Sequence, residues 1–459
     1  SFVILAAIGI VAGPASAPST ASGAGKPNIL VLLADDMGFA DVGFEECRDI
    51  PTPRIDALAA GGVRFSNGYV SGPYCSPTRA GLLTGRYQQR FGHEFNGSGP
   101  GFGLPTSETT IADRFKAAGY ATGLVGKWHL GGAPRFHPQQ RGFDEFFGFL
   151  GGAHTYFAAA SEDLYRGTEV VKETTYLTDA FGREAAAFID RHKDAPFFLE
   201  VAFNAVHTPM NATDDRLARF KEIADPTRKA YAAMLSALDD AVGVVLDKLS
   251  AAGLEENTLI VFLSDNGGPT MPGTTINGSR NDPFRGSKRT TLGGGIHVQF
   301  VMSWKGRLPA GKVYDQPVIQ LDVLPTALAA AGVAVQSDWK LDGVDLLPYL
   351  TGAETKAPHD TLYWRLGRQA AIRRGDWKLV RYDAAVDTPG ARSSGGNVVT
   401  PFRLYNLAQD QGETKDLTAD HPDKAEELRA AWQDWSRLLP APSWGPGGQR
   451  AAAKAKAKN

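Results

Sequence analysis

The chain has 459 residues, of which 43% are hydrophobic and 21% are charged. This length exceeds one ordinary hydrophobic core, so we expect a large domain and a smaller one, and the composition excludes a disordered or membrane-embedded protein. The formal net charge of −2 excludes a general electrostatic attraction to nucleic acid or to acidic membranes.

The N-terminal residues 1–17 form an apolar run that is too short to span a bilayer and ends in the small residues Ala15, Ser16 and Ala17. This pattern is typical of a secretory signal, so we interpret residues 1–25 as a signal remnant with a flexible lead-in. It predicts an exported protein, periplasmic or extracellular, without membrane insertion in the mature form. The alternative is a disordered chain end with no targeting role.

Short apolar runs then alternate with amphipathic helical stretches, which predicts an α/β fold. Four of these runs resemble strands buried on both faces: residues 28–34, 120–126, 197–203 and 258–264. Asp225 and Pro226 begin a long amphipathic helix that Gly253 ends. We therefore expect a large mixed, mostly parallel sheet sandwiched by helices, in a catalytic domain of residues 26–354.

The pattern changes near residue 355. Alternating apolar positions in 368–382, a short strand at 402–407 and a helix at 422–439 predict a smaller antiparallel sheet with one helix. We assign residues 355–445 to this C-terminal α+β subdomain, with a Gly/Ser-rich loop at 386–400. The basic, Ala-rich residues 446–459 are expected to be a disordered tail.

Each of the four apolar strands is followed by polar residues that a hydrophobic core does not need. Because the carboxyl ends of parallel strands meet at one edge of a sheet, these residues are expected to reach one crevice. In strand order they are Asp35 and Asp36, Lys127 and His129, His207, and Asp265 and Asn266.

The oxygen-bearing members of this set indicate a metal site. Asp35, Asp36, Asp265 and Asn266 offer hard oxygen ligands, which suit Ca²⁺ or Mg²⁺ and argue against Zn²⁺. Turn chemistry alone explains a pair such as Asp35 and Asp36. Three adjacent carboxylates, however, repel one another unless a cation neutralises them, which favours the metal.

The run from Tyr74 to Arg86 places a cysteine, Cys75, at a predicted helix start. Pro77 suits the first turn of a helix, and Ser76 is expected to be its N-cap. Cys75 would then lie at a helix N-terminus that favours an anion, with the Arg79 guanidinium one turn further on. The alternative is a buried structural cysteine that precedes a helix.

The pattern Cys75-x-Pro77-x-Arg79 followed by residues 80–86 resembles the signature of the type I, formylglycine-dependent sulfatases of the alkaline-phosphatase-like superfamily. Further motifs match that family in the same order along residues 26–439. They are residues 27–36, 52–56, 126–129, 207–209, 264–268 and the loop of Lys288.

The resemblance implies hydrolysis of sulfate monoesters, above all O-sulfate on a carbohydrate, so the expected partner is a sulfated glycan or a small sulfate ester. A formylglycine-generating maturation enzyme would convert Cys75 to the formylglycine that, once hydrated, is the nucleophile. The implied Ca²⁺ ligands, with Mg²⁺ as the poorer fit, are Asp35, Asp36, Cys75, Asp265 and Asn266. The implied sulfate-binding and proton-transfer residues are Arg79, Lys127, His129, His207 and Lys288.

One segment departs from the family pattern, and two other functions stay open. After Lys288 the family usually shows an aromatic residue and Glu before a Gly pair, then Arg and Pro, whereas residues 291–299 read TLGGGIHVQ. Packing beside the pocket is therefore expected to differ. The alternatives are an arylsulfatase or a phospho- or phosphonate monoester hydrolase of the same superfamily, and a non-catalytic glycan-binding protein with an unmodified Cys75.

Three loops offer candidate substrate contacts because polar and aromatic side chains suit sugar hydroxyls and ring faces. The candidates are His93, beside Glu94 and Asn96, then His154, beside Tyr156, and Arg280, beside Asn281 and Asp282. Ordinary solvation of loops explains these residues equally well.

Overall fold

The computed structural model describes residues 25–157 and 163–445. The predicted signal remnant up to residue 24 and the predicted tail from residue 446 lie outside the described residues. Within the described ranges, no helix is both long enough and apolar enough to cross a bilayer.

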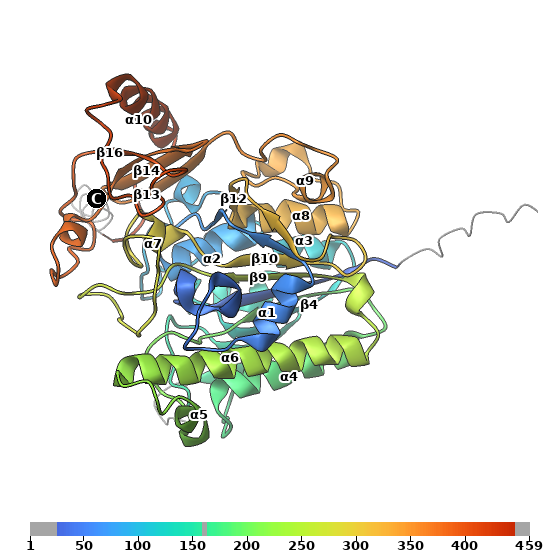
Figure 1. The fold of residues 1–459 in the computed structure, drawn as a ribbon. Helices are drawn as coiled ribbons and strands as arrows, with labels where there is room; N and C mark the ends of the chain where they lie inside the picture. The colour runs from blue at the N-terminus through green and yellow to red at the C-terminus, as the bar shows by residue number, and fades with distance from the viewer. Residues whose placement is uncertain (1–24, 158–162, 446–459) are drawn as a thin grey trace, which may run out of the picture.

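A large mixed sheet forms the centre of the molecule (Figure 1). Its strands are β1 (Asn28–Ala34), β2 (Val63–Phe65), β4 (Ala121–Lys127), β5 (Glu145–Phe149), β6 (Leu164–Arg166), β7 (Glu169–Val171), β8 (Phe197–Ala202), β9 (Thr258–Ser264), β10 (Phe300–Ser303) and β11 (Lys312–Tyr314). Their spatial order is β11-β2-β10-β9-β1-β8-β4-β5-β6-β7. The central run from β9 to β5 is parallel throughout, which confirms the predicted fold class.

The predicted strands coincide with the observed ones because a short, continuous apolar run suits a strand that is buried on both faces of a sheet. β1 and β9 agree residue for residue with the prediction, and β4 and β8 differ from it at their ends. All seven residues of β1 are buried.

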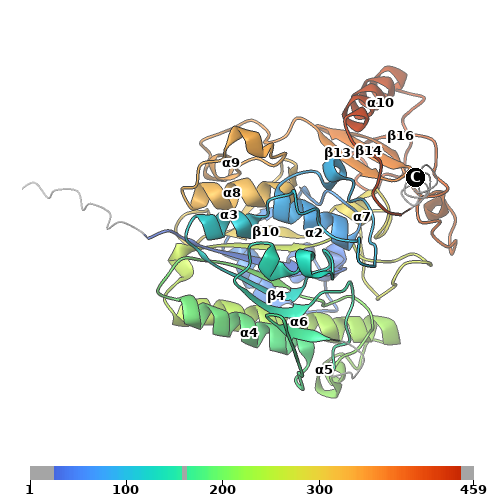
Figure 2. The same cartoon turned by 180° about the vertical axis from the view of Figure 1, so that it is seen from behind.

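Helices cover both faces of this sheet (Figures 1 and 2). One face carries α1 (Pro53–Ala60), α4 (Leu177–His192), α5 (Asp214–Arg219) and α6 (Pro226–Ala251), and the other carries α2 (Cys75–Thr84), α3 (Ile111–Ala117), α8 (Val323–Ala330) and α9 (Leu347–Thr351). The Asp225 side chain accepts the Thr227 N–H and begins α6 as predicted.

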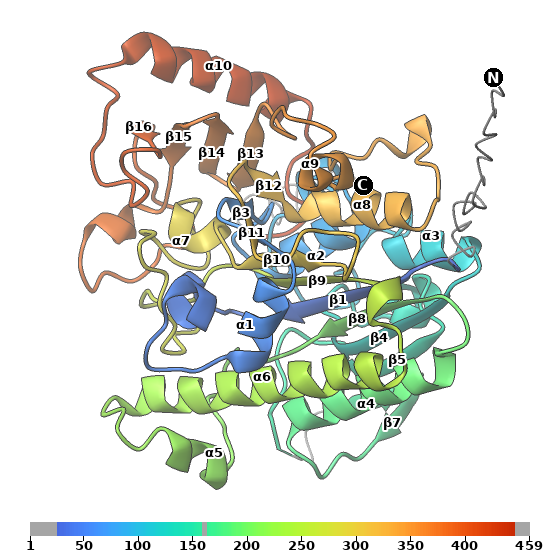
Figure 3. The same cartoon turned by 45° about the vertical axis from the view of Figure 1, so that its right-hand side comes forward.

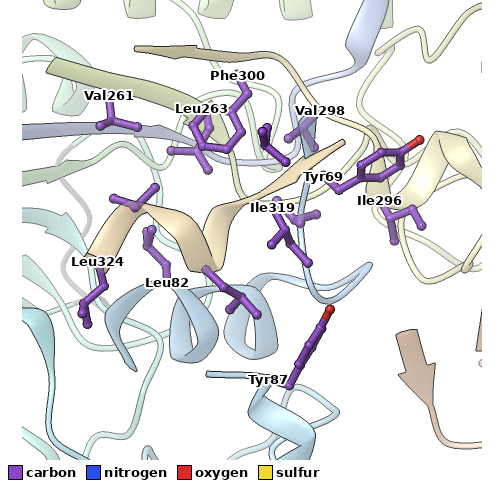
Figure 4. Packing of buried hydrophobic residues seen from close by; sticks show 14 of the residues in the cluster. Tyr69, Leu82, Tyr87, Val261, Leu263, Ile296, Val298, Phe300, Ile319 and Leu324 are labelled. Atoms are coloured by element: carbon purple, nitrogen blue, oxygen red, sulfur yellow. The ribbon is translucent and has the colours of Figure 1, made fainter. Parts of the chain in front are cut away.

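Side chains on alternate positions of the central strands enter two separate cores. Figure 4 shows part of the core between the sheet and α2, where Leu263 of β9 and Phe300 of β10 face Leu82 of α2 and Leu324 of α8. These four side chains are almost fully buried. The start of α2, which carries Cys75, is therefore held against the sheet by close-packed hydrocarbon.

The C-terminal part forms the predicted antiparallel sheet with its helix (Figure 3). The strands are β13 (Leu362–Leu366), β14 (Gln369–Arg374), β15 (Trp377–Arg381) and β16 (Arg403–Asn406), and the helix is α10 (Pro422–Arg437). The shorter elements β3 (Gly68–Tyr69), β12 (Val318–Ile319) and α7 (Gly293–Ile296) lie between the two sheets.

The two sheets share one hydrophobic core. The indole of Trp364, on β13, donates to the carbonyl of Val70 at 2.7 Å, and Trp432 of α10 donates to the carbonyl of Trp364 at 3.0 Å. Because packing is continuous across residue 355, the boundary drawn there from the sequence stays a prediction.

Glu200 lies near the middle of β8 and is only 4% exposed. Its Oε2 has no hydrogen-bond partner within the described residues. Burial raises the pKa of Glu200 from 4.5 to about 7, against the opposing charge of Arg79. Ionisation of this carboxyl therefore costs the folded state more than the unfolded one.

Replacement of this carboxyl is expected to change the pH dependence of stability. Since the folded pKa is the higher one, wild-type stability should fall as the pH rises from 4.5 to about 7. Glu200→Gln should remove this loss. The free energy of unfolding of the variant minus that of the wild type should therefore be up to about 3 kcal/mol more positive at about pH 8 than at about pH 4. Guanidinium unfolding at both pH values measures it, and a pH-independent difference would contradict the assignment.

Candidate active site

The polar residues that follow β1, β4, β8 and β9 meet at one edge of the sheet. β1 and β9 pair in register up to Ala34 opposite Ser264, so Asp35 and Asp265 leave the sheet side by side. The Asp36 N–H donates to Asp265 Oδ1 at 3.2 Å. Lys127 contacts Asp35 and His207 lies beside Asp36, so the predicted convergence of the four strand ends is present in the structure.

Four of the predicted metal ligands converge on one point. One ligand atom from each of Asp35, Asp36, Cys75 and Asp265 lies within 4.8 Å of the other three. Asn266 donates through Nδ2 to Asp36 Oδ1 at 2.7 Å, and its buried Oδ1 has no hydrogen-bond partner within the described chain. An unpartnered amide oxygen beside three carboxylates fits a hard divalent cation such as Ca²⁺.

Helix α2 begins at Cys75 and has Tyr74 as its N-cap, so it starts two residues earlier than a Ser76 N-cap requires. The expected capping role of Ser76 is therefore wrong, because Ser76 already lies inside the first turn. The Ser76 N–H donates to Asn96 Oδ1 at 3.1 Å, so a distant side chain supplies the acceptor. The Ser76 hydroxyl instead donates to the carbonyl of His129 at 2.8 Å and so joins α2 to the end of β4.

The loop that contains His93 packs against the first turn of α2. His93 is fully buried, and its Nε2 lies 2.6 Å from Ser76 Oγ. Burial lowers the pKa of His93 to about 3, so the ring is neutral. Glu94 pairs with Arg365 of β13 at 2.5 Å. The structure therefore gives His93 and Glu94 structural partners instead of an open surface.

Three buried cations each contact one of the three carboxylates. The pairs are Arg79 with Asp265 at 2.8 Å, Lys127 with Asp35 at 2.5 Å, and Lys288 with Asp36 at 2.7 Å. All six side chains are at most 3% exposed. The three positive and three negative charges cancel, so a bound divalent cation would make the site net positive and attractive to an anionic substrate.

Burial and the neighbouring charges set the ionisation of this cluster. Burial and the Asp35 charge raise the pKa of Asp265 to about 6, against Arg79. Burial alone would raise the pKa of Asp35, but Lys127 and the neighbouring cations hold it below its usual range. Burial raises the pKa of the Cys75 thiol although Lys127 and Lys288 oppose it. The unmodified thiol is therefore protonated and a poor nucleophile at neutral pH.

Two histidines reach the cluster with different hydrogen bonds. His207 Nδ1 lies 2.6 Å from the carbonyl of Thr208, which can only accept, so Nδ1 carries a proton and Nε2 faces Asp36 Oδ2 at 3.6 Å. His129 Nδ1 is buried without a partner in the described chain. Burial and then the Lys127 charge lower the pKa of His129 well below its usual value, so this ring is neutral.

Two residues that the sequence analysis did not name contact the site directly. Thr275 donates to Asp36 Oδ2 at 3.2 Å, and Asn277 Nδ2 donates to the Asp36 carbonyl at 3.0 Å. No spacing or composition distinguishes Thr275 and Asn277 from other loop residues, so only the fold reveals them. Tyr156, from a loop that the sequence analysis did select, is buried with its hydroxyl 2.8 Å from the His207 carbonyl.

The remaining substrate-contact candidates lie on the loops around this edge. His154 Nδ1 lies 2.7 Å from the carbonyl of Thr155, and its ring lies against Phe149. The Arg280 side chain is 53% exposed and pairs with Asp49 at 3.3 Å. Substrate contact by His154 and Arg280 stays a prediction.

Comparison with known proteins agrees with this geometry. The family model described as Sulfatase matches residues 27–333. The chain belongs to the sulfatase family. It is a sulfuric ester hydrolase.

Relatives of this sulfatase include N-acetylgalactosamine-6-sulfatase of Canis lupus familiaris, 36% identical over 454 residues, which cover 90% of this chain and 84% of the relative. The uncharacterized sulfatase YdeN of Escherichia coli strain K12 is 34% identical over 399 residues, which cover 76% of this chain and 70% of the relative. The crystal structure of Ps i-CgsB in complex with k-i-k-neocarrahexaose superposes with a TM-score of 0.83 at 36% identity, covering 93% of this chain and 96% of that one.

The carboxylate cluster predicts that a divalent cation stabilises the folded sulfatase. After chelation, Ca²⁺ at about 100 times its dissociation constant should raise the melting temperature by about 4 °C, because only the folded site binds it. Asp36→Ala should abolish this rise, whereas the surface variant Asp247→Ala should keep it. Differential scanning calorimetry checks this, and an equal rise in both variants would contradict the site.

Proposed function

We propose that this sulfatase removes O-sulfate groups from a carbohydrate, with a formylglycine made from Cys75 and a Ca²⁺ ion in the site. The observation that carries the proposal is the convergence of Asp35, Asp36, Asp265 and Cys75 within 4.8 Å of one another. Asp35, Asp36, Asp265, Asn266 and the modified residue 75 would hold the ion.

The formylglycine and the metal ion would supply a nucleophile and positive charge. Hydrated formylglycine would offer a hydroxyl group where the buried Cys75 thiol stays protonated, and Ca²⁺ would stabilise negative charge next to it. Arg79, Lys127 and Lys288 bind the sulfate oxygens and stabilise the charge that develops on them. Because all three cations are buried, water screens these interactions little.

The two histidines take opposite proton-transfer roles. His207 keeps its Nδ1 proton bonded to the Thr208 carbonyl, so Nε2 gives a proton to the departing alcohol oxygen only from the doubly protonated ring. Burial lowers the pKa of His207, whereas the charges of Asp35 and Asp36 favour the doubly protonated ring. His129 is neutral, and its buried Nδ1 has no hydrogen-bond partner among the described residues, which suits the base that removes a proton before sulfate is released.

The carbohydrate assignment rests on the relatives. The canine relative carries the name of an N-acetylgalactosamine-6-sulfatase, and the Ps i-CgsB structure holds k-i-k-neocarrahexaose. We therefore propose a sulfated glycan as the substrate of this chain as well. A formylglycine-generating enzyme and export from the cytoplasm belong to the same proposal.

Modification of Cys75 can be tested by mass. Tryptic mapping of active enzyme should find the Cys75 peptide about 18 Da lighter than the encoded one, because an aldehyde replaces the thiol. Cys75→Ala should lower kcat/KM for an aryl sulfate at least about 1,000-fold, since the nucleophile is lost.

The other cysteine of the chain is the matched control. Cys47 lies outside the cluster and donates to Asp49 at 3.3 Å. Cys47→Ser can keep that hydrogen bond and should retain activity within about two-fold. An unmodified Cys75 peptide in fully active enzyme would contradict the proposal.

Substrate class follows from rates on matched esters. We expect kcat/KM for an aryl sulfate to exceed that for the corresponding aryl phosphate by at least about 100-fold, and defined sulfated mono- and disaccharides to include a substrate better than the aryl sulfate. Preference for the phosphate would favour the phospho- or phosphonate hydrolase alternative. If the enzyme hydrolyses the aryl sulfate but none of the sulfated sugars, the result favours the arylsulfatase alternative.

A further inference from the structure

Arg289 follows Lys288 directly, but its side chain leaves the buried cluster. Its Nη1 donates to the carbonyl of Gly273 at 2.9 Å, and its Cζ lies 5.6 Å from the centre of the Tyr74 ring. Lys288 Nζ lies 5.6 Å from the centre of the same ring. The half-buried Tyr74 thus stands beside both cations, immediately before Cys75.

The Arg289 backbone is held in place independently of its side chain. Its N–H donates to the carbonyl of Pro73 at 2.7 Å, and its own carbonyl accepts from Gln369 Nε2 at 2.8 Å. The residue has φ +73°, a left-handed conformation that non-glycine residues adopt at a cost. These backbone contacts fix the position of the Arg289 Cα, from which the guanidinium-bearing side chain extends.

The Gly/Ser-rich segment 386–400 packs against Arg289 and the neighbouring residues 272–273. A Cβ on Gly395 would lie 2.7 Å from Arg289 Nη2, so the backbone of this segment lies close to the guanidinium. The Ser393 N–H donates to the carbonyl of Pro272 at 2.8 Å. The C-terminal part of the chain therefore forms one wall beside the active site.

Two exposed arginines of the C-terminal part lie on the same wall. The side chain of Arg392 lies against Gly273, and Arg368 donates to the carbonyl of Asn397 at 2.9 Å. The hydrogen bonds of the Arg289 and Arg368 guanidinium groups go to backbone carbonyls, and within residues 25–157 and 163–445 neither these two nor Arg392 forms an ion pair with a carboxylate. The wall thus carries positive charge that the protein does not neutralise.

We propose that this wall, with Arg289 at its centre, binds a second anionic group on the sugar next to the one that loses its sulfate. The inference rests on the proposed carbohydrate substrate and names its class: an oligosaccharide with a sulfate or carboxylate on the neighbouring residue. The buried cations around Cys75 bind the reacting sulfate. Arg289 follows Lys288 in the sequence, and its side chain lies outside this buried cluster. A planar guanidinium with nitrogen atoms still available suits a sulfate or carboxylate of this kind.

The test measures binding, so that it does not depend on turnover. In a Cys75→Ala background, calorimetry would compare three disaccharides that each carry one sulfate on the terminal sugar. On the neighbouring sugar they bear hydroxyls only, a second sulfate, or a carboxylate. Arg289→Gln should raise the Kd of the disulfated probe about 10-fold and leave that of the monosulfated probe within about two-fold.

Two further variants serve as controls. Arg289→Lys keeps the charge without the fork and should lose less than Arg289→Gln. Arg307→Gln removes an exposed arginine that stacks on Trp304 after β10 and should change no Kd. If Arg289→Gln also raises the Kd of the carboxylate probe, the site accepts either anion. If it raises only the Kd of the disulfated probe, the site is specific for sulfate.

The contrary results are distinct from one another. An equal loss for all three probes would show that Arg289 acts through Lys288 and would overturn the proposal, as would no change for any probe. If none of the disaccharides binds while the parent enzyme hydrolyses an aryl sulfate, the carbohydrate assignment itself fails, and the proposal fails with it.

Discussion

Three buried carboxylates lie together at one edge of the sheet, and the rest of the site depends on how their charges are balanced. Asp35, Asp36 and Asp265 are fully buried and lie close enough to share one ion. Like charges at this spacing in a dry environment are unstable without matching positive charge. Arg79, Lys127 and Lys288 supply that charge from α2, β4 and a loop, so elements distant in sequence must meet here.

The same charge balance explains how the site can favour an anion. Without a metal the cluster is neutral, and its lysines and arginine are occupied by carboxylates. A divalent cation would take over part of that role and leave the three cationic side chains for sulfate oxygens. Because the sheet and α2 are fixed by two close-packed cores, the groups are held in position before substrate arrives.

The C-terminal sheet packs against the segment that follows the Lys288 loop. Where the family usually has Glu before a Gly pair, this chain has Leu292 and Gly293, and the Gly293 N–H donates to Glu413 at 2.5 Å. Glu413 also pairs with the buried Lys378 of β15 at 2.8 Å. His297 stacks on Phe284 with 3.9 Å between ring centres. The packing of this segment therefore depends on a carboxylate more than a hundred residues away along the chain.

The central strands, the long helix α6 and the polar residues at the strand ends could be predicted without the fold. They follow from local patterns, namely continuous apolar runs, an Asp-Pro helix start and the rule that parallel strands end at one edge. Three contacts could not be predicted in this way: Asn96 accepts from the Ser76 N–H at the start of α2, His93 contacts the Ser76 hydroxyl, and Arg289 donates to Gly273. Such contacts join loops far apart in the chain, and their geometry depends on the packing of the whole core, which no local spacing encodes.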